Sequence, residues 1–337
     1  MIQRQRKTRG LQLLALSLLL TLLVGCTRLP VTVNHSLLGT EVSITVHDID
    51  SRLKGKLVYA AIESAFVEIE RVEDLCKWNQ LKKLNGYAGY QPYPIGQELM
   101  GLIDHAYDVA AKTEGAFRPD TGPLVNLWKI GTDYARIPEP YEIDEALQVM
   151  NNTVFTPIDS IQACLDPGRA SIELGGIAKG YAVDRACEVL MDLGVKAGMV
   201  WAGGDLRVFG AKRDGTPWRI AVRHPRKPNE FLRVLEIREG AVATSGDYER
   251  YSILEGGKYC HIFDPWQGMP SRASISSTVV MQTCMDADAY ATAMFVLGPE
   301  EGIHLADRLA IPTLIADEPG GEMQVMENEL FRQFVSE

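Results

Sequence analysis

Between residues 198 and 282 the chain divides into short extended runs, and this pattern limits the possible folds more than any other feature. The runs span 198–202, 206–210, 218–223, 232–237, 241–244, 259–263 and 275–282. Glycine pairs or Asp-Gly turns separate several of them, which favours antiparallel strands. Helical spacing of apolar residues occurs on either side, at 54–76, 97–113, 177–193, 286–297 and 299–309. Because no regular strand–helix–strand period links the two kinds of segment, we expect an α+β fold with mixed or antiparallel sheets flanked by helices.

The remaining segments carry weaker patterns. Alternating apolar residues predict strands at 41–47 and 313–316, and residues 27–40 are expected to be a tether leading into the first strand. The stretch 115–166 is rich in Pro and Gly and is expected to be mostly loop, with a short helix near 141–150.

The first 26 residues are typical of a targeting segment. Basic side chains occur at positions 4–9, and the apolar run 11–24 ends at Gly25-Cys26. A spanning helix needs about 20 apolar residues, whereas a basic start with a shorter apolar run is typical of a secretory signal. The four residues ending at Cys26 resemble the bacterial lipobox, in which the cysteine is acylated and becomes the new N-terminus. We expect 1–26 to be a lipoprotein signal peptide cleaved before Cys26, and 27–337 to be one domain; an uncleaved signal anchor is the alternative.

The charge balance argues against nucleic-acid binding. The chain has 34 Lys and Arg against 44 Asp and Glu, and four of the basic residues belong to the first 26. An acidic protein is poorly suited to bind nucleic acid, because clustered basic side chains are needed to neutralise the phosphates. Five cysteines remain after Cys26, without CxxC spacing, so neither a disulfide framework nor a thiolate metal site is expected, although one disulfide is possible.

The segment 171–184 places two glycines in front of a helical stretch. Glu173 ends an extended run, Gly175 and Gly176 make a tight turn, and Lys179 follows about one turn into the helix. A glycine turn that opens a helix lets the backbone approach a phosphate, whose charge the helix N-terminus favours. A surface lysine beside an ordinary glycine cap would look the same, so both interpretations stay open.

Asp288 and Thr292 lie four residues apart in a stretch that predicts a helix. Positions four apart share one helical face, where a carboxylate and a hydroxyl would offer Mg²⁺ two hard oxygen ligands. Asp286 is expected to point to a different face. Acidic capping of the helix without any metal is the alternative.

Ser245 and Asp247 precede a predicted hairpin turn at 255–257, and His261 follows it. Two strands joined by that turn would place the histidine near both side chains, where it could act as a general base. A hydrogen-bonded structural histidine is the alternative. The sequence has no Gly-x-Ser-x-Gly and no His-Glu-x-x-His, which leaves serine hydrolases and zincins little support.

Seven phrases of the chain, taken in order, resemble the FAD:protein FMN transferases, called the ApbE family. The resemblance runs from residue 38 to about 306, and the phrases are 115–117, 122–128, 174–184, 203–205, 243–248, 261–265 and 287–292. Members split FAD and attach its FMN half, through a phosphodiester, to a Thr or Ser of a target protein, releasing AMP. The resemblance implies an ApbE-like α+β domain with this activity, with FAD as substrate and Mg²⁺ as cofactor. Typical targets are flavin-carrying subunits of membrane electron-transfer complexes.

The resemblance also assigns residues, each matched to its position in this sequence. It implies that the cation is held by the backbone carbonyl of Gly176 and by the side chains of Asp288 and Thr292. It implies that the flavin nucleotide is contacted by Leu38, Trp78, Ala116, Phe117, Arg118, Glu173, Lys179 and the backbone of Ile262. His261 is the candidate for accepting the proton of the acceptor hydroxyl, with Asp247 and Ser245 as possible supporting groups.

The chain departs from the family pattern at several of these positions. Arg118 stands where an Asp or Asn is common, Ala291 where some members carry a second metal-binding Asp, and the loop 79–85 is shorter than usual. Two alternatives therefore stay open beside the transferase: an FAD pyrophosphatase that releases FMN and AMP, and a non-catalytic FAD-binding lipoprotein. With the lipobox and the usual targets, we expect a lipid-anchored protein on the periplasmic side of the inner membrane.

Overall fold

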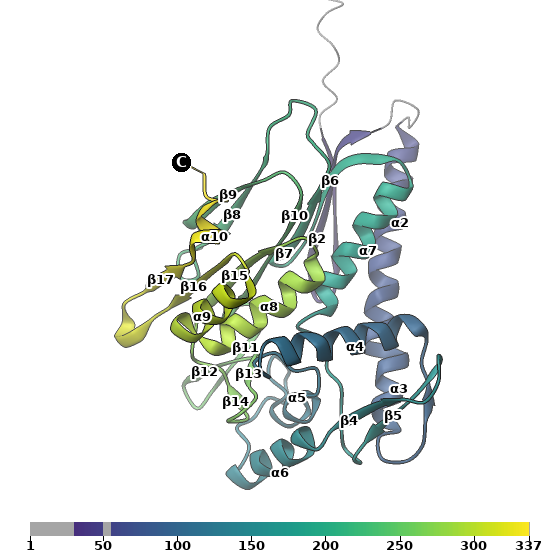
Figure 1. Cartoon of the computed structure of the whole chain (residues 1–337), viewed down its shortest axis with the longest axis vertical. Helices are drawn as coiled ribbons and strands as arrows, with labels where there is room; N and C mark the ends of the chain where they lie inside the picture. Colours follow the sequence, from purple (N-terminus) through teal and green to yellow (C-terminus); the bar gives the residue numbers. More distant parts are fainter. Residues whose placement is uncertain (1–29, 50–54, 337) are drawn as a thin grey trace, which may run out of the picture. The chain divides into compact units, whose positions relative to one another are not determined.

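An eight-stranded sheet forms the centre of the fold (Figure 1). The computed structural model describes residues 30–49 and 55–336, so the predicted signal peptide and Cys26 lie outside the described residues. The strand order is β1-β2-β6-β7-β10-β15-β16-β17, and each pair from β2 to β17 is antiparallel. The strands are Val31–Leu37, Thr40–Ile49, Val195–Ala202, Asp205–Phe209, Gly240–Gly246, Ser276–Met281, Thr313–Asp317 and Gln324–Glu327.

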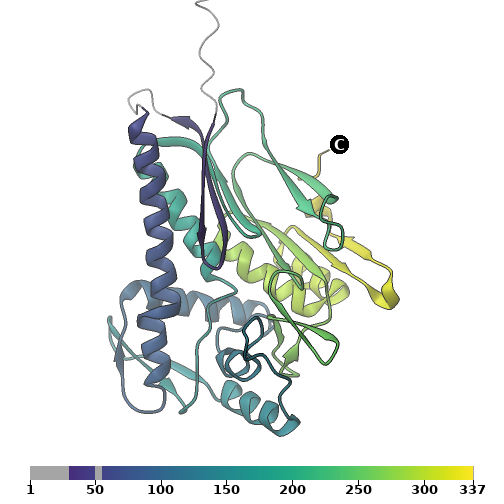
Figure 2. The same cartoon turned by 180° about the vertical axis from the view of Figure 1, so that it is seen from behind.

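Helices cover one face of this sheet (Figure 2). α7 (Ala178–Asp192), α8 (Cys284–Leu297) and α9 (Pro299–Leu309) pack against the strands, and α2 (Lys56–Glu73) packs on α7. α8 is buried on nearly every side because it lies between the sheet and the neighbouring helices. Its apolar sequence, 293–297 above all, fits that position.

A two-stranded ribbon covers the opposite face. β8 (Trp218–Arg223) and β9 (Phe231–Ile237) pair antiparallel, and Trp218 and Leu235 pack into a buried cluster with Val242 of the central strand β10. Alternate residues of a strand face opposite sides, so Ser245 of β10 points toward α8 instead. The short helix α10 (Glu329–Arg332) adds Phe331 to the cluster.

The rest of the chain forms a second layer, made mostly of short elements. It contains π-helical η1 (Asp74–Trp78), α3 (Gln80–Gly86), α4 (Gln97–Lys112), α5 (Gly122–Trp128) and α6 (Pro140–Asn151), whereas the 3-10 turn η2 (Pro319–Gly321) connects β16 and β17 of the central sheet. The strands of the second layer are β3 (Tyr93–Pro94), β4 (Val154–Pro157), β5 (Gln162–Asp166), β11 (Tyr251–Leu254), β12 (Gly257–Cys260), β13 (Phe263–Asp264) and β14 (Met269–Pro270). Of the described helices, none is both long and apolar enough to cross a bilayer.

The α+β prediction is confirmed, and the differences concern short elements. The expected tether 27–40 contains strand β1, and the expected loop 79–85 is helix α3. The expected loop 115–128 ends in helix α5, and strands β4 and β5 were not predicted. Each of these elements is seven residues or shorter, and tertiary packing rather than its local pattern decides its conformation. Cys76, Cys164, Cys187, Cys260 and Cys284 are all free thiols.

Candidate active site

A cavity of about 1140 Å³ opens where α7, α8 and the central sheet meet the layer of short elements. Its walls come from distant parts of the chain, including the β1–β2 turn, the end of η1, the loop before α5 and the segment after β12. Of the residues that the sequence analysis assigned to the site and that the structure describes, all except Asp247 line it. These residues are Leu38, Trp78, Ala116, Phe117, Arg118, Glu173, Gly176, Lys179, Ser245, His261, Ile262, Asp288 and Thr292.

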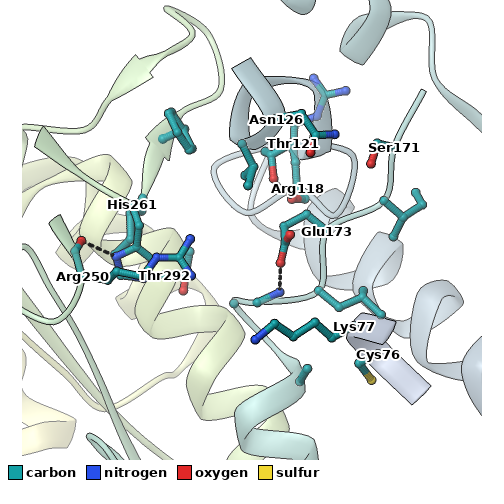
Figure 3. A pocket seen from close by; sticks show the side chains of 18 of the residues that line it. Cys76, Lys77, Arg118, Thr121, Asn126, Ser171, Glu173, Arg250, His261 and Thr292 are labelled. Atoms are coloured by element: carbon teal, nitrogen blue, oxygen red, sulfur yellow. Dashed lines mark hydrogen bonds between the residues drawn. The ribbon is translucent and has the colours of Figure 1, made fainter. Parts of the chain in front are cut away.

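The glycine turn before α7 brings backbone close to α8. The Glu173 carboxylate accepts a hydrogen bond from the Gly175 N–H at 2.7 Å and so holds the turn (Figure 3). A Cβ atom at Gly176 would lie only 3.2 Å from both the Phe117 ring and the Thr292 hydroxyl. The absence of a side chain therefore lets the backbone of Gly176 approach Thr292 closely.

Asp288 and Thr292 present oxygen atoms to the cavity, as the helical spacing predicts. Oδ2 of Asp288 accepts the Gly180 N–H at 3.1 Å, and the Thr292 hydroxyl lies 3.2 Å from that of Ser245. Asp286 is turned elsewhere, because its carboxylate bonds to His105 at 2.7 Å and to Thr283. Burial and the nearby charge of Asp205 raise the pKa of Asp288 above its usual range.

This oxygen set fits a magnesium ion better than a softer metal. It combines one carboxylate, one hydroxyl and a closely placed backbone segment, all of which are hard ligands. In the part of the chain that the structure describes, no cluster of three His, Cys, Asp or Glu side chains could hold a metal alone. Mg²⁺ tolerates such an incomplete site because it keeps several waters and shares substrate phosphates.

Lys179 lies between two buried carboxylates, and one of them was not predicted. Its ammonium donates to Asp205 and lies 4.0 Å from Oδ1 of Asp288. Although burial opposes the charge, the two carboxylates raise the pKa of Lys179 above its usual value, so the side chain is a cation. In the sequence, Asp205 is the residue directly after a Gly-Gly turn. That position of an acidic residue was the available signal for its role.

His261 is held in one tautomer at the wall of the cavity. Its Nδ1 lies 3.0 Å from the carbonyl oxygen of Arg250 (Figure 3). A carbonyl oxygen can only accept, so Nδ1 carries the hydrogen and Nε2 keeps its lone pair. Burial, together with the positive charge of Arg250, lowers the pKa of His261 to about 4, so the ring is neutral at pH 7.

Asp247 does not line this cavity, although Ser245 in the preceding strand β10 does. Its carboxylate accepts two hydrogen bonds from Arg226, at 2.8 and 2.9 Å, and lies 3.1 Å from Lys258. It lines a second cavity of about 410 Å³ instead. In the described residues, no direct contact between Asp247 and His261 supports the predicted role of Asp247. Ser245, by contrast, lies in the main cavity.

Arg118, a predicted flavin contact, is engaged in structural contacts, as is Trp128 at the end of the matched segment 122–128. The guanidinium of Arg118 pairs with Asp120 at 2.7 and 2.8 Å and with Asn151 at 2.8 Å, so its positive charge at the cavity wall is largely neutralised. Trp128 is fully buried and donates to the carbonyl of Gly268, which makes it a core residue. Trp78, by contrast, is 56% exposed at the cavity wall, with Lys77 and Lys82 over its ring.

Asp184 fixes the start of α8 and was not predicted to do so. Its carboxylate accepts the N–H groups of Cys284 and Met285 at 3.0 and 2.9 Å, and it pairs with Arg207 at 2.8 Å. A Cβ atom at Gly180 would lie 2.1 Å from the carbonyl oxygen of Cys284, so α7 and α8 approach without an intervening side chain. Asp184 thereby sets where α8 begins, and so where Asp288 and Thr292 lie.

Replacing Asp184 by alanine is expected to lower the free energy of unfolding by about 3 kcal/mol, because it leaves Arg207 and two helix N–H groups buried without a partner. Urea denaturation followed by circular dichroism measures this. The matched control is Asp192→Ala at the exposed end of the same helix, for which we expect a change below about 0.5 kcal/mol. Equal stabilities of the two variants would contradict the capping role.

Comparisons with known proteins point in one direction. A sequence model of the ApbE family matches residues 38–315. The chain is 31% identical over 332 residues to the FAD:protein FMN transferase of Vibrio cholerae serotype O1, which covers 96% of this chain and 98% of that protein. The crystal structure of the ApbE protein from Thermotoga maritima gives a TM-score of 0.83 at 32% identity, covering 91% of this chain and 100% of that one. The flavin transferase ApbE from Vibrio cholerae gives a TM-score of 0.78 at 28% identity, covering 90% and 99%.

Proposed function

Because the chain belongs to the ApbE family, we propose that it is a Mg²⁺-dependent FAD:protein FMN transferase that attaches FMN through a phosphodiester to a Thr or Ser of a target protein. The observation that carries the proposal is the placing of a neutral His261 in the same cavity as Asp288 and Thr292. Transfer of a phosphoryl group from a pyrophosphate to a hydroxyl requires a base and a bound cation in the same cavity.

The reaction needs one bond made and one broken at phosphorus. The acceptor hydroxyl oxygen attacks the phosphorus on the FMN side of FAD, and the bond from that phosphorus to the bridging oxygen breaks, so that AMP leaves. The hydroxyl proton passes to Nε2 of His261, which carries a lone pair because Nδ1–H is committed to Arg250. The ring is neutral at pH 7, so this lone pair is not already protonated.

The remaining residues bind and orient the substrate. Gly176, Asp288 and Thr292 would hold Mg²⁺, which supplies charge stabilisation to the phosphates when bound. The Lys179 ammonium lies beside the same region and would favour an anion. Leu38, Ala116, Phe117 and Trp78 supply the apolar wall for the flavin, with Arg118, Glu173 and the backbone of Ile262 as polar contacts.

The partners follow from the same proposal. A hydroxyl acceptor on flavin-carrying subunits of membrane electron-transfer complexes fits this chemistry, and the predicted lipidation of Cys26 would keep the enzyme at the periplasmic side of the inner membrane with those targets. The acidic composition beyond residue 26 remains the argument against a nucleic-acid partner.

The products distinguish this reaction from simple hydrolysis of FAD. A transferase releases one AMP for each acceptor molecule that gains FMN, and AMP release stops when no acceptor is present. Continuous AMP and free FMN production without acceptor would identify a pyrophosphatase and contradict the proposal.

A further inference from the structure

The environment of Lys179 poses a problem for the proposed cation site. Its ammonium lies 4.0 Å from Oδ1 of Asp288, while Oδ2 of the same carboxylate is already bonded to the Gly180 N–H. Oδ1 has no hydrogen-bond donor of its own among the described residues, so it is the oxygen more open to Mg²⁺. An ammonium this close is a competitor for it, since two opposite charges in a buried site attract strongly.

Asp205 holds this competitor to one side. Its carboxylate accepts the hydrogen bond from Lys179 and is only 1% exposed. Asp205 opens strand β7 in the central sheet, where it is paired with Ala202 of β6, so its position is set by the scaffold rather than by a loop. The Lys179 ammonium bonds to Asp205 and stays beyond hydrogen-bond distance of Asp288.

We propose that Asp205 is a positioning residue that binds the ammonium of Lys179 and so keeps Oδ1 of Asp288 open for Mg²⁺. This inference rests on the proposed function, since it concerns the cation that the transferase needs. It explains why a buried site with one cationic side chain can attract a second cation. Around Lys179 the carboxylates of Asp205 and Asp288 outnumber the single ammonium, which favours a second cation at this point of the cavity.

The test measures Mg²⁺ binding to the purified full-length chain by isothermal titration calorimetry, without FAD. In Asp205→Asn the ammonium loses its anionic partner and turns to Asp288, so we expect the affinity for Mg²⁺ to fall by about tenfold or more. In the double variant Asp205→Asn/Lys179→Met the competitor is gone, and we expect the affinity to return to within about threefold of the parent. A purely structural role, or direct ligation of the metal by Asp205, would give no such rescue.

Two further variants keep the inference falsifiable if Asp205→Asn folds poorly. Lys179→Met alone is expected to bind Mg²⁺ at least as tightly as the parent, and weaker binding would overturn the inference. Glu249→Gln changes another carboxyl group of the cavity, one that lies 3.1 Å from Arg223. A loss there as large as in Asp205→Asn would show an effect of cavity charge alone and would overturn the inference.

Failure of this inference is distinguishable from failure of the proposed function. If the parent binds no Mg²⁺ and still transfers FMN, the metal assignment falls, and the role of Asp205 falls with it. If the parent binds Mg²⁺ and the double variant stays as weak as Asp205→Asn, only the role of Asp205 is overturned.

Discussion

Replacing Asp288 by alanine is expected to lower FAD turnover by about three orders of magnitude while FAD still binds. The side chain supplies the only carboxylate of the predicted metal ligands, and charge stabilisation by a bound cation contributes several kcal/mol in such transfers. The apolar wall that would hold the flavin comes from other elements, so the affinity for FAD should change much less. AMP release at saturating Mg²⁺ measures turnover, and quenching of flavin fluorescence measures binding.

Asp286→Asn is the matched control for this variant. It lies on the same helix two residues earlier, but its carboxylate bonds to His105 and Thr283 and does not line the cavity. We expect turnover within about twofold of the parent. Turnover in Asp288→Ala equal to that of the control would remove Asp288 from the metal site.

Replacing His261 by alanine is expected to lower FMN transfer by about a hundredfold to ten-thousandfold, with FAD and Mg²⁺ still bound. Loss of a positioned general base costs this much in other enzymes. The imidazole hydrogen-bonds to the backbone carbonyl of Arg250 and not to a predicted metal ligand, so Mg²⁺ binding should be retained. Single-turnover transfer to an acceptor measures the chemical step, and calorimetry with Mg²⁺ checks the site.

The comparison for this variant is His304→Ala, which removes an exposed histidine on α9 outside the cavity. It should transfer FMN at the parental rate. Parental transfer by His261→Ala as well would exclude His261 as the base, and the tautomer fixed by Arg250 would then have only a structural meaning.

The elements that the sequence predicted well are those with many periodic positions. α2 and α4 each bury a regular stripe of apolar side chains, such as Ile62 and Ile69 in α2, and the spacing alone identifies them. The helical spacing of Asp288 and Thr292 likewise placed both oxygens on one face, in one cavity. Local periodicity was sufficient in these cases because a single helix determines the geometry.

Features that depend on two or more elements could not be predicted in this way. Asp205 binds Lys179 of α7, and Asp184 binds the N-terminus of α8. The sequence around each aspartate does not specify which residue of another element it contacts. The expected closeness of Asp247 to the site failed for the same reason. Its strand reaches the cavity at Ser245, but two residues later the backbone has left the sheet and the carboxylate meets Arg226.

The most direct test of the central claim is the mass of an acceptor protein. The purified chain is incubated with FAD, MgCl₂ and a flavin-carrying subunit that exposes a threonine acceptor, with and without EDTA, and intact mass and AMP are recorded. We predict a gain of one FMN residue by the acceptor, equal in amount to the AMP released, and abolished by EDTA. AMP and free FMN with an unmodified acceptor, or transfer that continues in EDTA, would contradict the account.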